Sequence, residues 1–197
     1  MRLYISAASP FARKCRIVAR ECGVELEEIG VDVMALDPRL VAANPIAQVP
    51  ALEIEDGTMF IDSPLICAYL DGFSGAPKLL PPPPSAGHWR ASRTESIADA
   101  GLEMAVKVVL EKRRPQGEQS QSWIDRWNGG LLRALAAAEA EVRPPEPLDI
   151  GLIALGCVGA YVDLRRPDLD WRPDYPRLAA FCEDMETRES FRATRPG

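Results

Sequence analysis

Residues 3–23 read LYISAASPFARKCRIVARECG, and this stretch decides the fold. Its first residues form a short apolar run, which predicts a β-strand. A helix is predicted to begin at Ser9 or Pro10, because serine favours the N-cap and proline the first helical position. Gly23 follows the last apolar position and marks the end of this helix. The opening stretch therefore predicts a strand that leads directly into a helix.

The predicted helix has one apolar face and an unusual charge at its start. Its apolar residues recur every three or four positions, so one stripe is predicted to pack against a core. This stripe consists of Phe11, Cys15, Val18 and Cys22. Three cations, Arg13, Lys14 and Arg16, lie in the first two turns, where the helix dipole disfavours positive charge. A cationic helix start indicates a place for an anion.

Composition and charge restrict the class of protein. The 197 residues include 23 lysines and arginines against 29 aspartates and glutamates, for a net charge of −6. This acidic balance argues against a general nucleic-acid binder. Five scattered cysteines without a Cys-x-x-Cys pair indicate a reduced, cytoplasmic protein. The sequence shows no signal-peptide pattern, and its longest apolar run is too short to cross a bilayer, so no membrane partner is expected.

The order of predicted elements divides the chain into two parts. Residues 1 to about 72 read β-α-β-α-β-β-α, which predicts a mixed sheet with helices packed on it. Glycine and proline are concentrated between Gly72 and Gly87, and this composition is typical of an extended linker. Beyond the linker only helical patterns follow. We therefore predict three regions: an α/β domain at 1–75, a proline-rich linker at 76–87 and an all-helical bundle domain at 88–197.

Further elements are predicted on both sides of the linker. In the first part these are a second strand within 24–33, a short helix from Asp37-Pro38, a hairpin at 51–61 and a helix after Asp62-Ser63-Pro64. In the second part they are helices at 88–113, 119–142, 149–164 and 175–185, with a final turn at 189–192. The helix at 149–164 is apolar on all sides, which predicts a buried centre. Asp149 is its predicted N-cap.

This element order resembles the glutathione S-transferases, and local motifs support the resemblance across nearly the whole chain. The run SPFARK at 9–14 resembles the start of the first helix in serine-type bacterial members. Asn44-Pro45 followed by Gln48-Val49-Pro50 resembles the segment that carries the family's cis-proline. Asp62-Ser63 resembles the family's pair of an acidic residue and a serine. One departure is Leu152, which stands where the family usually has a capping-box aspartate.

The resemblance implies a thioredoxin-like N-terminal domain that binds glutathione and a helical C-terminal domain that supplies most of the electrophile pocket. It implies a cytoplasmic detoxification enzyme, a glutathione transferase that forms homodimers and attacks a small hydrophobic electrophile with the glutathione thiolate. Glutathione is the implied co-substrate, and no metal is expected. Ser9 is the implied catalytic residue, with Arg13 as electrostatic support. The implied glutathione-binding residues are Ser9, Gln48, Val49, Asp62 and Ser63, and Pro50 is the implied cis-proline.

Each of these residues also has a purely structural interpretation. Ser9 and Ser63 could serve only as helix caps. Asp62 could be a solvated turn acid, and Gln48 an exposed loop amide. Cysteine chemistry is not expected, because Cys15 and Cys22 lie on the apolar stripe. His88 is the single histidine, and a lone histidine in a sequence indicates neither a metal cluster nor a supported Cys-His or Ser-His pair, so packing is the favoured interpretation.

Two other functions remain open at this point. The chain could be a glutathione-binding or protein-interaction module that keeps the fold without turnover. It could also be a glutathione-dependent isomerase or dehalogenase, since serine-assisted thiolate chemistry serves these reactions too. The electrophile cannot be predicted, because pockets built from apolar side chains carry no spacing pattern.

Overall fold

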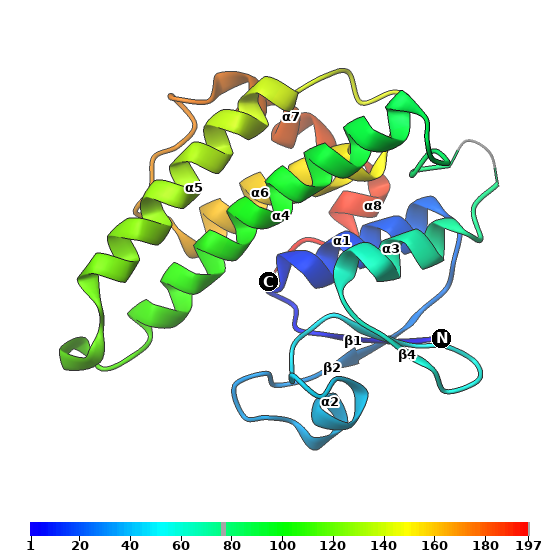
Figure 1. Ribbon diagram of the computed structural model, residues 1–197, viewed down its shortest axis with the longest axis horizontal. Helices are drawn as coiled ribbons and strands as arrows, with labels where there is room; N and C mark the ends of the chain where they lie inside the picture. The colour runs from blue at the N-terminus through cyan, green and yellow to red at the C-terminus, as the bar shows by residue number, and fades with distance from the viewer. Residues whose placement is uncertain (76–77, 197) are drawn as a thin grey trace. The chain divides into compact units, whose positions relative to one another are not determined.

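The computed structural model describes residues 1–75 and 78–196, so Ala76 and Pro77 of the predicted linker lie outside the described residues. The chain forms two compact units. Unit 1 comprises Met1–Pro82 together with Glu189–Gly197, and unit 2 comprises Pro83–Arg188. Unit 1 holds a four-stranded mixed sheet with helices, and unit 2 is helical (Figure 1). This architecture confirms the predicted fold class, a thioredoxin-like α/β part followed by a helical part.

The sheet of unit 1 has the strand order β2-β1-β3-β4. Its strands are β1 (Arg2–Ile5), β2 (Glu27–Gly30), β3 (Ala51–Glu53) and β4 (Met59–Phe60). β1 runs parallel to β2 and antiparallel to β3, which in turn runs antiparallel to β4. The hairpin between β3 and β4 turns at Gly57, whose φ of +84° explains the glycine. β4 therefore runs in the same direction as β1.

The described residues of unit 1 form four helices: α1 (Pro10–Glu21), α2 (Pro38–Ala43), α3 (Ser63–Asp71) and α8 (Glu189–Arg192). α1 and α3 lie side by side on one face of the sheet and α2 on the other (Figure 1). α1 begins at the predicted position, with Ser9 as its N-cap, and ends before Gly23, whose φ is +68°. Its core side carries Cys15, Ile17 and Val18, all fully buried.

The end of the chain returns to unit 1. The sequence pattern predicts residues 189–197 as part of the helical domain, whereas in the structure α8 packs against α1 and belongs to unit 1. Arg13 Nη2 donates to the carbonyl of Phe191 at 3.1 Å, and Arg16 Nη1 donates to the carbonyl of Thr194 at 3.4 Å. Phe191 itself is fully buried. Cations at the end of a short helix complement its dipole, so α1 and α8 hold each other by charge as well as by packing.

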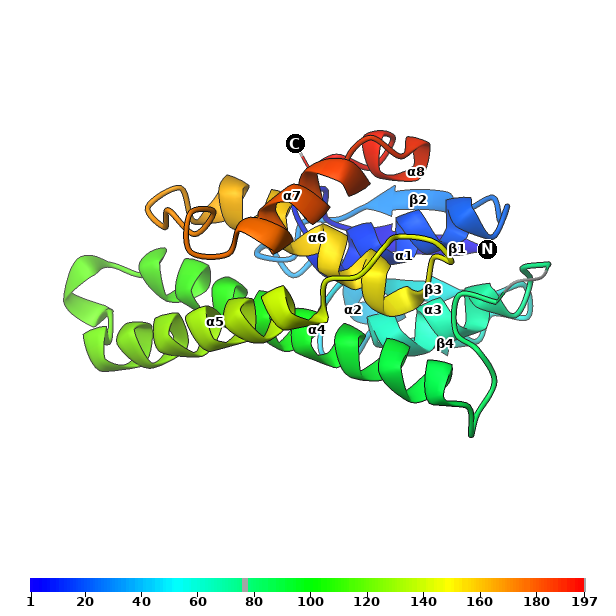
Figure 2. The same ribbon diagram turned by 90° about the horizontal axis from the view of Figure 1, so that it is seen from above.

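Unit 2 is built from four long helices and one short 3₁₀ turn: α4 (Ala86–Lys112), η1 (Gln116–Glu118), α5 (Gln121–Glu141), α6 (Ile150–Arg165) and α7 (Pro176–Met185). α4 and α5 form a long antiparallel hairpin (Figure 2). α6 packs on α4 and is buried along most of its length, which confirms its prediction as the buried centre. Within the described residues, no helix combines the length and apolar character that crossing a membrane requires.

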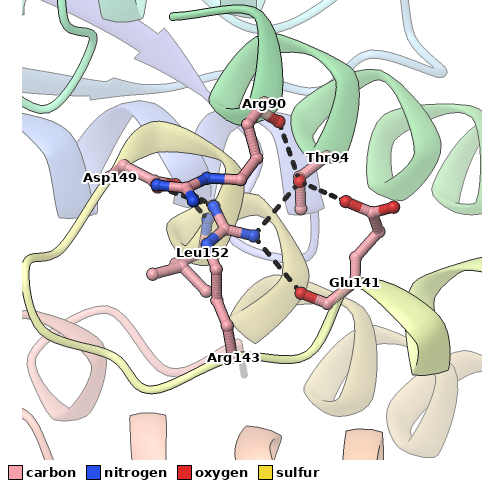
Figure 3. A network of polar contacts seen from close by, with 6 residues as sticks. All are labelled: Arg90, Thr94, Glu141, Arg143, Asp149 and Leu152. Carbon is pink, nitrogen blue, oxygen red and sulfur yellow. Dashed lines mark hydrogen bonds and ion pairs between the residues drawn. The ribbon is translucent and has the colours of Figure 1, made fainter. Parts of the chain in front are cut away.

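The start of α6 is fixed by the predicted cap and by an arginine that no sequence motif marks. Asp149 Oδ1 accepts from the Leu152 backbone N–H at 3.0 Å, as an N-cap does. Arg143 Nη2 also lies 2.7 Å and 2.6 Å from the two oxygens of Asp149 (Figure 3). Leu152 cannot return a capping-box bond from its side chain. Arg143 instead orients the capping carboxylate.

A second layer of the same network connects α6 to α4 and α5. Arg143 Nη1 donates to Thr94 Oγ1 at 3.2 Å and to the Glu141 carbonyl at 3.3 Å. Thr94 is fully buried, and its hydroxyl lies 2.9 Å from both the Arg90 carbonyl and Glu141 Oε2 (Figure 3). Buried polar networks stabilise a fold only when their members are satisfied. The removal of one charged member should therefore be costly.

α7 lies so close to α6 that a glycine is required between them. A Cβ placed on Gly159 would lie 2.8 Å from the Cβ of Cys182, closer than packed carbons approach. The Cys182 thiol is 2% exposed, its Sγ donates to the Leu155 carbonyl at 3.5 Å, and burial raises its pKa to about 12. The folded chain thus holds this proton more tightly than the unfolded chain, whose thiol titrates near pH ~8.5.

This difference predicts a loss of stability in alkali. The contribution of Cys182 is fully present below pH ~8.5 and is lost as the pH rises toward about 12. Over this window the thiol should lower the free energy of unfolding by about 1.4 kcal/mol per pH unit. Urea unfolding of the wild type and of Cys182→Ala at two pH values within the window measures the difference in slope. Equal slopes for the two proteins would contradict the expectation.

Candidate functional site

Sheet topology brings the predicted site residues of unit 1 to one end of the strands. Because β4 runs parallel to β1, the helices that follow these strands, α1 and α3, both begin at the end of the sheet where β1 and β4 finish. β3 starts at this same end, since Ala51 pairs with Tyr4 near the end of β1. The three segments 6–9, 48–50 and 61–63 therefore converge there, and we call this place the convergence point.

Ser9 occupies the turn between β1 and α1. It is half-buried, its backbone is extended, and its Oγ accepts from the Ala12 N–H at 3.2 Å. A hydroxyl that accepts this cap bond still has its own proton to donate. Within residues 1–75 and 78–196, no protein acceptor is found for that proton. Ser9 can therefore cap α1 and donate to a ligand at the same time.

Asp62 and Ser63 lie at the start of α3. The cap is Asp62, whose side chain accepts from the Ser63 N–H, so the alternative that Ser63 itself caps the helix is wrong. Ser63 is the first helical residue and is 1% exposed. Its Oγ has no hydrogen-bond partner in the described part of the chain. A buried hydroxyl without a partner is costly, and this one stands beside the positive end of a helix dipole.

Gln48, Val49 and Pro50 connect α2 to β3. The Val49–Pro50 peptide bond is cis. Pro50 is buried, Val49 half-buried and the Gln48 side chain exposed. No hydrogen bond of the Val49 backbone is found among the residues that the structure describes. This short segment therefore presents an open backbone edge next to the starts of α1 and α3.

Arg13 lies one turn into α1, and its guanidinium is directed to the end of the chain. It is 2% exposed, with its guanidinium carbon 5.4 Å from the centroid of the Phe191 ring. Arg16 pairs with Glu28 at 2.9 Å. Both cations therefore hold other parts of unit 1 in place, and electrostatic support of a ligand by Arg13 stays a prediction.

The cysteines and the histidine are not among the residues of the three converging segments. Cys15 is fully buried, with its Sγ 3.8 Å from both the Cys67 Sγ and the Ser63 carbonyl. Burial raises the pKa of the Cys22 thiol to about 11. His88 packs edge-on against Trp89 with ring centroids 4.8 Å apart. Among the described residues, no group of three or more metal-ligating side chains is found.

The sheet order, the helix that opens beside a serine and the cis-proline segment define a thioredoxin-like unit with a helical unit attached. Sequence comparison agrees with this class. A family model described as the glutathione S-transferase N-terminal domain matches residues 3–78, and one described as the glutathione S-transferase C-terminal domain matches residues 121–184. The chain belongs to the glutathione S-transferase family.

Individual relatives resemble the chain over very different spans. It is 31% identical to an uncharacterized GST-like protein, YibF, of Escherichia coli K12, over all of this chain and 98% of that protein. A maleylacetoacetate isomerase of Pseudomonas aeruginosa PAO1 is 31% identical over 50% of this chain and 48% of the isomerase. A crystal structure of a Methylobacillus flagellatus glutathione S-transferase with glutathione bound is 33% identical, with a TM-score of 0.92, over 100% of this chain and 99% of that one.

Proposed function

We propose that this protein is a cytoplasmic glutathione transferase that binds glutathione at the convergence point in unit 1 and ionises its thiol beside Ser9. The observation that carries the proposal is the buried Ser63 hydroxyl, which lacks a protein partner at a helix start. Binding of glutathione by the solved relative supports the choice of ligand. The role that follows is detoxification by conjugation to a small hydrophobic electrophile.

The α-carboxylate of glutathione fits the start of α3. Pro64 has no N–H, and the Ser63 N–H is already accepted by Asp62. A ligand carboxylate would therefore receive the Ser63 hydroxyl and the Leu65 N–H, close to the positive end of the helix dipole. Asp62 is exposed at the same turn, where it can pair with the ligand's ammonium group.

The cysteinyl part of glutathione fits against the backbone of Val49. The cysteinyl backbone can pair with the Val49 N–H and carbonyl in the manner of an added antiparallel strand. Gln48 is exposed beside Val49 and can reach the glycyl carboxylate. With both ends of the tripeptide held, its sulfur would lie near Ser9 at the start of α1.

The chemistry follows from the state of the sulfur. Free glutathione should resemble free cysteine, with a thiol pKa of about 8.5, so only about three per cent is thiolate at pH 7. The thiolate is the nucleophile. A hydrogen bond from Ser9 and the dipole of α1 both favour the ionised form. The rest of the rate enhancement must come from holding the electrophile next to the sulfur.

Calorimetry on Ser63→Ala tests the binding mode. A hydrogen bond to a charged group contributes about 1.5 to 3 kcal/mol, so the variant should bind reduced glutathione at least about tenfold more weakly than the wild type. A matched ligand provides the control: γ-aminobutyryl-cysteinyl-glycine lacks the α-carboxylate, and both proteins should bind it equally. Absence of glutathione binding by the wild type, or equal losses for the two ligands, would contradict the proposal.

The isomerase relative favours a second reaction class. Addition of a thiolate to a conjugated double bond, followed by rotation and elimination, isomerises the bond without net consumption of the thiol. Activity assays should therefore include maleylacetoacetate beside a chloronitrobenzene. Turnover of maleylacetoacetate alone would assign the isomerase reaction, whereas glutathione binding without turnover of any electrophile would indicate a binding module.

We extend the proposal to a homodimer, on the basis of an aromatic face on unit 1. Phe60, Tyr69 and Phe73 form a ladder of edge-to-face contacts with ring centroids 4.7 and 5.2 Å apart. Phe73, which follows α3, is 55% exposed, and Leu65 within α3 is 51% exposed. Exposed apolar patches of this kind mark interaction sites. Sedimentation equilibrium measures the association state directly.

A further inference from the structure

Asn44 is a buried polar residue in the loop between α2 and β3. It is 2% exposed, and each of its polar groups forms a hydrogen bond. Its side-chain Nδ2 donates to the Gln48 carbonyl at 2.8 Å, and its Oδ1 accepts from the Ile46 N–H at 3.1 Å. Its backbone N–H and carbonyl bond to the Leu40 carbonyl at 2.7 Å and the Ala47 N–H at 2.8 Å. The Asn44 side chain thus bonds to two backbone groups of the loop formed by residues 45–48.

The chemistry of this position is specific to asparagine. The Ile46 N–H can only donate and the Gln48 carbonyl can only accept, so the two contacts require one acceptor and one donor on the same short side chain. Aspartate would keep the acceptor but would place a second oxygen against the Gln48 carbonyl. Alanine would remove both bonds and leave the two backbone groups without these partners.

The loop ends at the candidate site. It passes through Ala47 with a φ of 50°, a left-handed conformation that residues other than glycine adopt less readily, so the loop needs external support. The Gln48–Val49 peptide bond is trans, so the Gln48 carbonyl and the Val49 N–H point in opposite directions. With the Gln48 carbonyl bonded to buried Asn44, the Val49 N–H therefore points away from Asn44. Val49 is the residue at which the tripeptide backbone would pair.

We propose that Asn44 is a positioning residue for the cysteinyl part of the ligand. It fixes the Gln48 carbonyl so that the Val49 N–H points away from Asn44 in a defined register. The inference rests on the proposed function, because it assigns a role within the same glutathione site. Asn44 does not touch the ligand, and its effect should appear in affinity for glutathione rather than in the chemistry at sulfur.

Steady-state kinetics on Asn44→Ala and Asn44→Asp test the assignment. Both variants should raise the KM for glutathione about tenfold, while kcat at saturating glutathione stays within about threefold of the wild type. Asn44→Asp keeps the Ile46 contact and serves if Asn44→Ala does not fold. The matched control is Asn128→Ala in unit 2, which removes another asparagine bond, to Arg166 Nη1 at 2.7 Å. This control should lower the melting temperature without changing the KM.

A ligand variant separates positioning from general destabilisation. Glutathione N-methylated at the cysteinyl amide cannot donate to the Val49 carbonyl and should bind the wild type more weakly than glutathione does. In Asn44→Ala that difference should shrink, because the Val49 edge is no longer held in register. A folded Asn44→Ala whose KM stays within twofold of the wild type, or an equal rise in Asn128→Ala, would overturn the inference. Failure of the wild type to bind glutathione would instead overturn the proposed function.

Discussion

Replacement of Ser9 by alanine should lower the conjugation rate at pH 7 by up to about thirtyfold at saturating glutathione. This factor is the full gain from ionisation, since a two-unit fall in thiol pKa converts about three per cent thiolate into the majority species. The deficit should shrink as the pH rises above about 9, because the thiol then ionises without help. A pH–rate profile of the two proteins with a chloronitrobenzene measures both effects.

The same substitution removes a helix cap and should cost about 1 kcal/mol of stability. Ser85→Ala is a matched control, because Ser85 caps α4 through a 3.2 Å bond from the His88 N–H and lies in unit 2. The control should lose similar stability and keep its activity. Full activity in Ser9→Ala at pH 7, or an equal loss in Ser85→Ala, would remove Ser9 from the mechanism.

Asp149→Ala should have the largest effect on stability. It deletes the cap of α6 and leaves Arg143, which is 18% exposed at its side chain, without its carboxylate partner. Loss of one member of a largely buried pair costs about 3 kcal/mol or more. For a chain of this length that loss lowers the melting temperature by roughly 6 to 12 °C. Urea unfolding gives the free energy directly.

Two further variants separate the cap from the charge pair. Asp149→Asn keeps a good capping oxygen and should cost less than Asp149→Ala. Arg143→Met removes the arginine, and the double variant Arg143→Met/Asp149→Ala completes a cycle whose coupling energy measures the pair. We expect the double variant to be more stable than the sum of the single losses implies. A loss below about 1 kcal/mol for Asp149→Ala would contradict the importance of this network.

The elements of the fold could be predicted because local chemistry marks their ends. Ser9, Pro10 and Gly23 bound α1 at the predicted positions. The turn at Gly57 and the cap at Asp149 were also predictable, since each depends on residues a few positions away in the chain. Backbone conformation and capping are local properties, and sequence patterns report them well.

Contacts between distant residues could not be predicted in this way. The cations of α1 indicated an anion site, but Arg13 binds the carbonyl of Phe191, a residue 178 positions later. Two other contacts are short in sequence and still could not be predicted. Arg143 bonds to Asp149 six residues later, and Asn44 bonds to the Gln48 carbonyl four residues later. Both lie in irregular loops, where no turn or capping pattern marks them. Asparagine before proline was visible in the sequence, but its burial was not.

The candidate site contains both features that the sequence predicted and features that it did not. The Ser9 turn, the Gln48–Pro50 segment and Asp62-Ser63 were predicted as separate motifs, and the sheet register explains why they converge. The sequence did not predict which residue caps α3, because either Asp62 or Ser63 could have served as the cap. The structure assigns the cap to Asp62 and leaves the Ser63 hydroxyl without a protein partner in the described residues.

The most direct measurement is the thiol pKa of glutathione bound to this protein, obtained by ultraviolet titration of thiolate absorbance at saturating ligand. We expect the bound thiol to titrate about two units below the value of about 8.5 expected for the free thiol, and the value in Ser9→Ala to lie closer to that of the free thiol. Glutathione that binds but keeps a pKa near ~8.5 would contradict thiolate stabilisation at the start of α1.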